Sequence, residues 1–131
     1  MLFAKRVFQV AGVYGLIVVA LGYGAYFYES GDSLLYNARA EYVHGFFLVT
    51  FAWQIAFLII ATDPLRYRML MLAAMLEKFP FTLAVLALFA LKYVGVTTLV
   101  FGLIDGVLGV LFCVAYVLTE GSAREEAEEA A

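Results

Sequence analysis

The chain has 131 residues, of which 66% are hydrophobic and 15% are charged, and its net charge is −3. A soluble domain this short could not bury so much apolar surface, and disorder requires low hydrophobicity, so both classes are excluded. One cysteine, Cys113, excludes a disulfide scaffold and a cysteine-based zinc site, and the acidic charge balance is not that of a nucleic-acid-binding protein. The composition therefore predicts an integral membrane protein.

Four apolar runs are each long enough, at about 20 residues, to cross the hydrocarbon of a bilayer as a helix. They cover approximately residues 7–28, 42–62, 69–93 and 96–119. Strands of a membrane barrel are much shorter and alternate in polarity. The first run also exceeds the apolar region of a signal peptide, so we expect it to stay in the protein. The runs predict an all-α fold with four membrane-spanning helices.

Short segments connect the runs, so consecutive helices should pack as antiparallel neighbours in an up-down-up-down four-helix bundle. After the second run, Asp63 is suited to cap the third helix, with Pro64 at its first position. A tight turn around Gly95 should join the last two runs. We therefore expect one transmembrane domain over 1–119. An acidic, helix-prone cytoplasmic tail should follow over 120–131, either as a solvated extension or as a docking segment.

Basic residues predict the orientation, because loops rich in lysine and arginine stay on the cytoplasmic side. With the N-terminus inside, six basic residues fall on the inner side or in the inner half of the membrane, and two fall outside. The inner six are Lys5, Arg6, Arg66, Arg68, Lys78 and Arg124, and the outer two are Arg39 and Lys92. This bias predicts a protein of the cytoplasmic (inner) membrane with both termini in the cytoplasm.

The third run has two interpretations, because Glu77 and Lys78 interrupt its apolar sequence. In one, the residues up to Glu77 form an interfacial helix and the span begins at Phe79, which leaves only about 15 apolar residues, fewer than a span usually needs. In the other, a single helix kinked at its internal proline runs from Pro64 through Tyr93. Glu77 then lies inside the membrane, and Lys78 can extend its ammonium group to the inner surface. We favour the single helix.

Glycines recur at helical spacing in the first and the fourth runs. They are Gly12, Gly15 and Gly22 in the first run, and Gly102, Gly106 and Gly109 in the fourth. Small residues let the backbones of membrane helices approach closely. We expect both glycine faces to pack inside the bundle. The GxxxG pattern of the fourth run leaves dimerisation as the alternative.

Asp105 is the strongest candidate for a functional side chain, because an ionisable group in hydrocarbon costs roughly 3 kcal/mol or more. Helical spacing places Asp105 on one arc with small and polar residues, among them Gly102, Gly109 and Tyr116. We expect this arc to face the bundle. The carboxyl group is suited to carry a proton, to anchor a ligand, or to pair with a basic or hydroxyl group. The alternative is a hydrogen-bonded carboxyl that serves packing.

The second run contributes His44 near its outer end and Gln54 deep in apolar sequence. Glu41, three residues before His44, can pair with the imidazole. His44 is then either an interfacial hydrogen-bonding group or a pH-responsive ligand contact. Gln54 needs a hydrogen-bond partner and is either a packing contact or a ligand contact. The candidate ligand-binding residues are therefore Asp105, His44, Gln54, Glu77 and Tyr116.

Four phenylalanines are the candidate pocket-lining residues: Phe47, Phe51, Phe101 and Phe112. Sequence motifs of known chemistry are absent, including CxxC, GxSxG, HExxH, Walker and GxGxxG patterns, an arginine ladder and paired haem-binding histidines. We therefore predict no metal site and no cofactor, and an enzyme is not the favoured class.

The chain resembles the DoxX-like group of small bacterial four-helix membrane proteins. The resemblance is carried by a Lys5-Arg6 start before a glycine-rich first helix, and by the segments EYVHGFF, TDPLRYRML and FGLIDGVLGVLF. It implies the four-helix membrane fold and a bacterial inner membrane. A few members of the group are tied to quinone-linked redox complexes or to lipid-related roles. The resemblance implies no catalytic residue.

Three functions follow from these features. The first is a bundle that binds a lipid-like or quinone-like molecule, with Asp105, His44 and Gln54 orienting it. The second is a structural or accessory subunit of a larger membrane complex. The third is a proton-coupled small transporter that uses Asp105. The expected partners are the lipid bilayer, a lipophilic small molecule, and further copies of the chain or a larger membrane complex, but no nucleic acid.

Overall fold

Four helices account for nearly all of the chain that the computed structural model describes, residues 1–30 and 40–129. They are α1 (Leu2–Ser30), α2 (Ala40–Thr62), α3 (Arg68–Ala90) and α4 (Val96–Glu129). All four are long and apolar enough to cross a membrane. The predicted all-helical fold with four helices of membrane-spanning length is confirmed. Arg39, counted in the prediction of orientation, lies outside the described residues.

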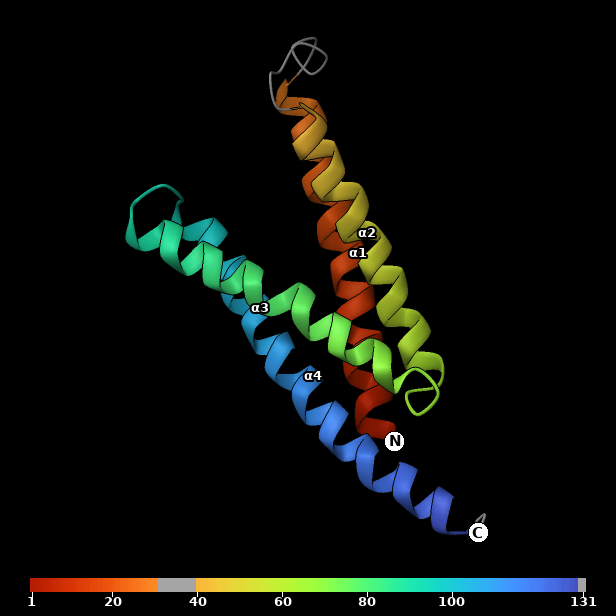
Figure 1. Ribbon diagram of the computed structural model, residues 1–131. Coiled ribbons are helices and arrows are strands. Elements are labelled where there is room, and N and C mark those ends of the chain that lie inside the picture. The colour runs from red at the N-terminus through yellow and green to blue at the C-terminus, as the bar shows by residue number, and fades with distance from the viewer. Residues whose placement is uncertain (31–39, 130–131) are drawn as a thin grey trace.

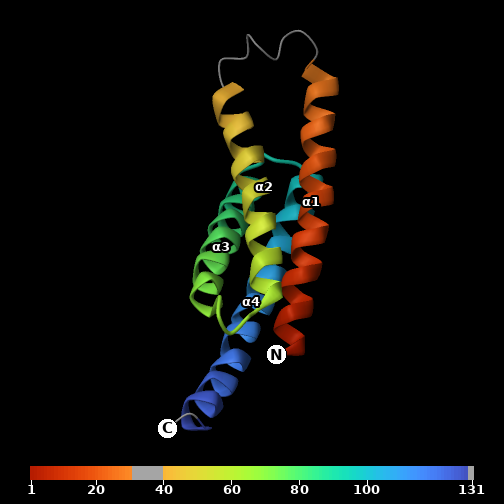
Figure 2. The same ribbon diagram turned by 90° about the vertical axis from the view of Figure 1, so that its right-hand side faces the viewer.

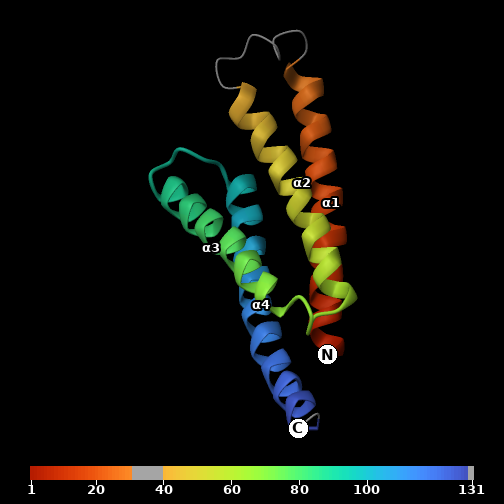
Figure 3. The ribbon, with the colours of Figure 1, turned by 45° about the vertical axis from the view of Figure 1, so that its right-hand side comes forward.

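Consecutive helices run in opposite directions, so that the first and the last helix place the two chain ends at the same end of the molecule (Figures 1 and 2). α1 packs mainly against α2, and α3 packs mainly against α4. The bundle is thus built from two hairpins: α1 and α2 form the first hairpin, and α3 and α4 form the second. The hairpins converge toward the end that holds both termini and separate toward the opposite end (Figures 1 and 3). The acidic tail expected after the fourth span continues α4 as a helix to Glu129.

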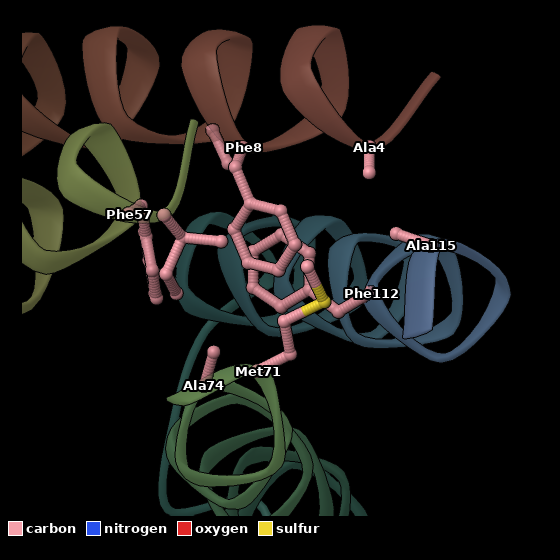
Figure 4. Packing of buried hydrophobic residues seen from close by; sticks show 9 residues of the cluster. Ala4, Phe8, Phe57, Met71, Ala74, Phe112 and Ala115 are labelled. Atoms are coloured by element: carbon pink, nitrogen blue, oxygen red, sulfur yellow. The ribbon is translucent and has the colours of Figure 1, made fainter. Parts of the chain in front are cut away.

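The two hairpins are joined by a buried cluster to which every helix contributes a large side chain. Phe8 of α1, Phe57 of α2, Met71 of α3 and Phe112 of α4 are all fully buried. The rings of Phe8 and Phe112 stack with centroids 4.2 Å apart, and Phe57 meets Phe112 edge-on at 5.1 Å (Figure 4). Each such pair contributes about 0.5–1.5 kcal/mol beyond its buried area. Because a membrane helix gains little from leaving lipid, this packing is what holds the hairpins together.

Three glycines of α1 face α2. A Cβ atom at Gly12 would lie 2.8 Å from the Leu58 side chain, a Cβ at Gly15 would overlap Oε1 of Gln54, and a Cβ at Gly22 would lie 3.3 Å from the Phe47 ring. These positions therefore need glycine for the close approach of the first two helices.

Three glycines of α4 serve the second hairpin in the same way. A Cβ at Gly102 would lie 2.6 Å from Val85, at Gly106 3.0 Å from Thr82, and at Gly109 3.0 Å from Phe79, all on α3. The GxxxG pattern of α4 is thus used for packing within the chain.

The beginning of α3 differs from the prediction. Pro64 does not open the helix, because residues 64–67 form a separate turn and the helix starts at Arg68. Asp63 stabilises this turn: its Oδ1 accepts the N–H of Arg66 at 3.2 Å, and its carbonyl accepts the N–H of Tyr67 at 3.1 Å. The local Asp-Pro signal is the same for a helix start and for an isolated turn. The prediction that Asp63 caps α3 is therefore wrong, because Asp63 stabilises the turn that precedes the helix.

α3 then runs through Pro80 to Ala90 without a break. The single-helix interpretation is confirmed, although the helix runs from Arg68 to Ala90 and not from Pro64 through Tyr93. Pro80 removes one backbone donor from the middle of the helix. α3 and α4 are joined by residues 91–95, where Lys92 adopts a left-handed φ of 62°. That conformation lets the N–H groups of Leu91 and Tyr93 bond the carbonyls of Ala87 and Leu88.

The left-handed backbone at Lys92 predicts that Lys92→Gly raises the free energy of unfolding by about 1 kcal/mol, because glycine adopts this φ without steric cost. The measurement is unfolding of the purified protein in detergent, followed by the fluorescence of its one tryptophan, Trp53. Lys92→Ala is the control. It removes the same charge but keeps a Cβ atom, so a gain of equal size in the alanine variant would contradict the explanation.

Close packing at Gly15 predicts that Gly15→Ala lowers the free energy of unfolding by about 1–3 kcal/mol, the usual cost of forcing extra volume into a packed site. Gly24 lies on the same helix with nothing within 4 Å of its Cβ position. Gly24→Ala should therefore leave the stability unchanged or raise it by about 0.5–1 kcal/mol. The same fluorescence measurement compares the two variants, and equal effects would refute the role assigned to Gly15.

Candidate functional site

An ion pair between Lys78 and Asp105 joins α3 to α4 inside their apolar spans. Lys78 is only 4% exposed, and its Nζ donates a hydrogen bond of 3.0 Å to Oδ1 of Asp105. The expectation that Lys78 reaches the inner surface is therefore wrong. The reason is the close helix contact at Gly109, whose Cβ position lies 3.3 Å from the Lys78 Cβ atom. Asp105 lies one turn before Gly109 on the same face, so the ammonium group meets a carboxylate on α4.

Glu77 adds a second carboxyl group to this pair. Its Oε2 atom lies 3.1 Å from Nζ of Lys78, but it is buried and accepts no hydrogen bond from the described residues. The side chains of Glu77 and Asp105 are 15% and 19% exposed. Two carboxyl groups therefore share one ammonium group. We call Glu77, Lys78 and Asp105 the charged cluster.

The other hairpin contributes aromatic side chains to the surroundings of the charged cluster. The ring centroid of Phe57, on α2, lies 5.2 Å from Nζ of Lys78, a distance at which a ring attracts a cation. Tyr14, on α1, interacts electrostatically with both Asp105 and Lys78. The charged cluster is thus a meeting point of all four helices.

Thr82 secures the same region of the second hairpin. Its Oγ1 lies 3.0 Å from the carbonyl oxygens of Lys78, on its own helix, and of Gly102, on α4. A hydroxyl that reaches an opposite backbone carbonyl fixes how far one helix can slide along the other. Thr82 therefore helps to hold Lys78 within reach of Asp105.

Gln54 is 2% exposed and lies against α1. Its Nε2 donates to the carbonyl of Thr50 at 3.0 Å, and its Oε1 accepts no hydrogen bond from an N–H or O–H of the described residues. The Oε1 atom lies against Gly15, where a Cβ atom would overlap it. Membrane helices pack by placing side chains against the small residues of a neighbouring helix. The contact with Gly15 therefore favours the packing interpretation of Gln54.

His44 belongs to an aromatic cluster at the far end of the first hairpin. Nδ1 of His44 lies 2.7 Å from the Tyr23 hydroxyl, so the imidazole pairs with α1 and not with Glu41 as expected. The rings of Tyr26 and Phe27 lie 5.9 Å and 5.7 Å from the imidazole. His44 precedes Gln54 by ten residues, about 15 Å along the helix. The structure therefore does not bring His44 to the charged cluster.

Tyr116 lies on α4 toward the end of the molecule that holds the termini. The guanidinium carbon of Arg68 stacks 3.8 Å from the centre of its ring, and the same guanidinium forms an ion pair of 3.3 Å with Glu120. Tyr116 follows Asp105 by eleven residues, about 16 Å along α4. Its contact fastens the first turn of α3 to α4.

The four phenylalanines chosen as pocket-lining residues do not come together. Phe112 lies in the buried cluster between the hairpins, and Phe47 stacks on Tyr23 with centroids 4.9 Å apart. Phe51 and Phe101 are 42% and 41% exposed on the outside of the bundle. Among the described residues, no group of three histidine, cysteine or acidic side chains could hold a metal ion. Of the side chains that the structure describes, those of the charged cluster are the best placed to bind or release a proton.

Comparison with protein-family models, with curated proteins and with solved structures finds no match for this chain. The resemblance to the DoxX-like group stays a prediction.

Sequence reasoning missed Lys78 as the partner of Asp105. In an antiparallel hairpin, residues at equal distances from the turn lie opposite each other. Gly106 packs against Thr82 and Gly109 against Phe79, so Lys78 lies one to one and a half helical turns beyond the position level with Asp105. The signal in the sequence was therefore a basic residue close enough to that position for its long side chain to reach the buried acid.

The sharing of one ammonium by two carboxyl groups predicts an order of stabilities. Lys78→Met should lower the free energy of unfolding most, by about 3–5 kcal/mol, because both carboxyl groups lose their counter-charge. Asp105→Asn should cost less, since Lys78 keeps Glu77, and Glu77→Gln should cost least, since it leaves the hydrogen-bonded pair intact. Thermal unfolding in detergent measures the order, and a Glu77 variant less stable than the Asp105 variant would contradict it.

Proposed function

We propose that this protein is a proton-coupled transporter of a small solute, with the charged cluster as its proton-binding site. The observation that carries the proposal is the charge count at Glu77, Lys78 and Asp105, where two carboxyl groups surround one ammonium group. With all three ionised, the charged cluster bears one uncompensated negative charge inside the membrane. Uptake of one proton makes it neutral.

The geometry favours Glu77 as the group that binds this proton. Asp105 accepts a direct hydrogen bond from Lys78. Oε2 of Glu77 is close to the same nitrogen but accepts no hydrogen bond from the part of the chain that the structure describes. A neutral Glu77 beside an intact Lys78–Asp105 pair is therefore the resting arrangement, and loss of its proton creates the charge that the cycle uses. The sequence pointed to Asp105 for this role, and the proposal moves the proton to its neighbour.

The location of the charged cluster supports coupling to movement. Its charges all lie on the α3–α4 hairpin, while Phe57 and Tyr14 approach it from the other hairpin. A change in its charge therefore acts at the contact between two units that are each packed more tightly internally than against one another. Rocking of one hairpin against the other is a motion by which membrane transporters change access to a central site.

We also propose that both termini face the cytoplasm. The end of the molecule that holds the termini carries Lys5, Arg6, Arg66 and Arg68, and the described part of the opposite end carries Lys92. An excess of basic residues at one end is typical of the cytoplasmic side.

The proposal predicts a protonated carboxyl group inside the membrane domain. Infrared difference spectroscopy of the purified protein, titrated from acidic to alkaline pH, should show a carboxylic-acid carbonyl band that is lost as the proton leaves. Glu77→Gln should remove this band, whereas Asp63→Asn, which changes a carboxylate in the turn outside the charged cluster, should leave it in place. A wild-type spectrum without the band, or a band that persists in the Glu77 variant, would refute the proton site.

Transport is tested separately in proteoliposomes under an imposed pH gradient. A panel of cationic, neutral and anionic solutes is screened for the electrical current that each one produces across the proteoliposome membrane. We expect currents in the wild type that depend on the pH gradient and are absent in Glu77→Gln. Currents insensitive to Glu77→Gln would contradict proton coupling. If the band is present but no solute gives a current, the accessory-subunit and ligand-binding hypotheses replace transport.

A further inference from the structure

A groove lies between the first turns of α1 and the last turns of α2, at the end of the molecule that holds the termini. It has a volume of about 340 Å³ and is lined by Lys5, Gln9, Leu58, Ala61 and Thr62. None of these residues belongs to the charged cluster, so the groove is independent of the proposed transport function.

The packing of the first hairpin explains why the groove exists. Gly12 lets α1 approach Leu58, which also lines the groove. Lys5 and Gln9 are one helical turn apart and share a face of α1. Their side chains form one wall, and the last turn of α2 forms the other. The groove therefore lies at the end of the molecule where the chain begins.

The lining of the groove is partly polar and partly apolar. Lys5 supplies an ammonium group, Gln9 an amide and Thr62 a hydroxyl, while Leu58 and Ala61 supply apolar surface. Arg6 and Arg66 add two exposed positive charges at the same end. Asp63 is the nearest acidic residue along the chain, and its Oδ1 is already engaged by the backbone N–H of Arg66. The charge around the opening is therefore net positive.

We propose that this groove binds the headgroup of an anionic phospholipid. The phosphate oxygens would accept hydrogen bonds from Lys5, the ester and glycerol oxygens would lie near Gln9 and Thr62, and the beginning of one acyl chain would lie on Leu58. Basic side chains at the membrane surface attract anionic lipids. The apolar surface of Leu58 and Ala61 favours a lipid over a free anion, because an acyl chain can pack against it and a free anion cannot.

The test measures lipid binding by native mass spectrometry of the full chain in detergent. Delipidated protein is titrated with phosphatidylglycerol, with phosphatidylcholine of the same acyl chains, and with inorganic phosphate. We expect phosphatidylglycerol to bind more tightly than phosphatidylcholine. Lys5→Gln should weaken phosphatidylglycerol binding about five-fold, the effect of one basic residue near a membrane surface. Gln9→Leu should also weaken it.

Arg6→Gln is the matched control, because it removes the same charge from the next position on the helix but outside the groove. It should change phosphatidylglycerol binding less than Lys5→Gln does. Equal losses in both variants would show general attraction to the surface and overturn the proposal. Equal binding of the two lipids would overturn it as well, and so would displacement of phosphatidylglycerol by inorganic phosphate, which would identify a simple anion site.

Discussion

The arrangement of the second hairpin depends on one constraint: a lysine inside an apolar helix must find a counter-charge. Lys78 meets this need through Asp105, and the pair can form only when α3 and α4 approach closely and at one register. Glycine at positions 102, 106 and 109 allows the approach, and the Thr82 hydroxyl, which reaches the Gly102 carbonyl, holds the same register. A shift of one turn, about 5.4 Å, would separate the charges. In hydrocarbon such a shift carries a cost that no lipid contact offsets.

The first hairpin reaches a similar closeness without charges. α1 and α2 approach through three glycines, the amide of Gln54 fills the space beside Gly15, and the Tyr23–His44 hydrogen bond closes the far end. Both hairpins therefore have contacts that specify one register, whereas the contact between them is a cluster of apolar rings. Rings pack well in more than one orientation, while an ion pair or a filled glycine position does not. The bundle therefore consists of two hairpins, each with a fixed internal register, and the contact that joins them restricts their relative orientation less.

The sequence predicted the spans well because hydrophobicity along the chain is what defines them. It predicted the inward face of Asp105 because small residues share its arc. It failed for Phe51 and Phe101, which are exposed on the outside, because the interior and the lipid are equally apolar and a phenylalanine suits both. It also failed for Lys78, because reasoning about one helix at a time assigned the ammonium to the membrane surface. The partner that overrides this preference lies 27 residues away on another helix.

The charged cluster belongs to the second hairpin and lies at the contact with the first. This position has a thermodynamic consequence. The Phe57 ring, from the opposite hairpin, is attracted to the Lys78 ammonium. That attraction weakens as the two carboxylates neutralise the ammonium and strengthens when one of them takes up a proton. Proton binding at Glu77 would therefore tighten the contact between the hairpins. By reciprocity, any solute or partner that separates the hairpins would favour release of the proton.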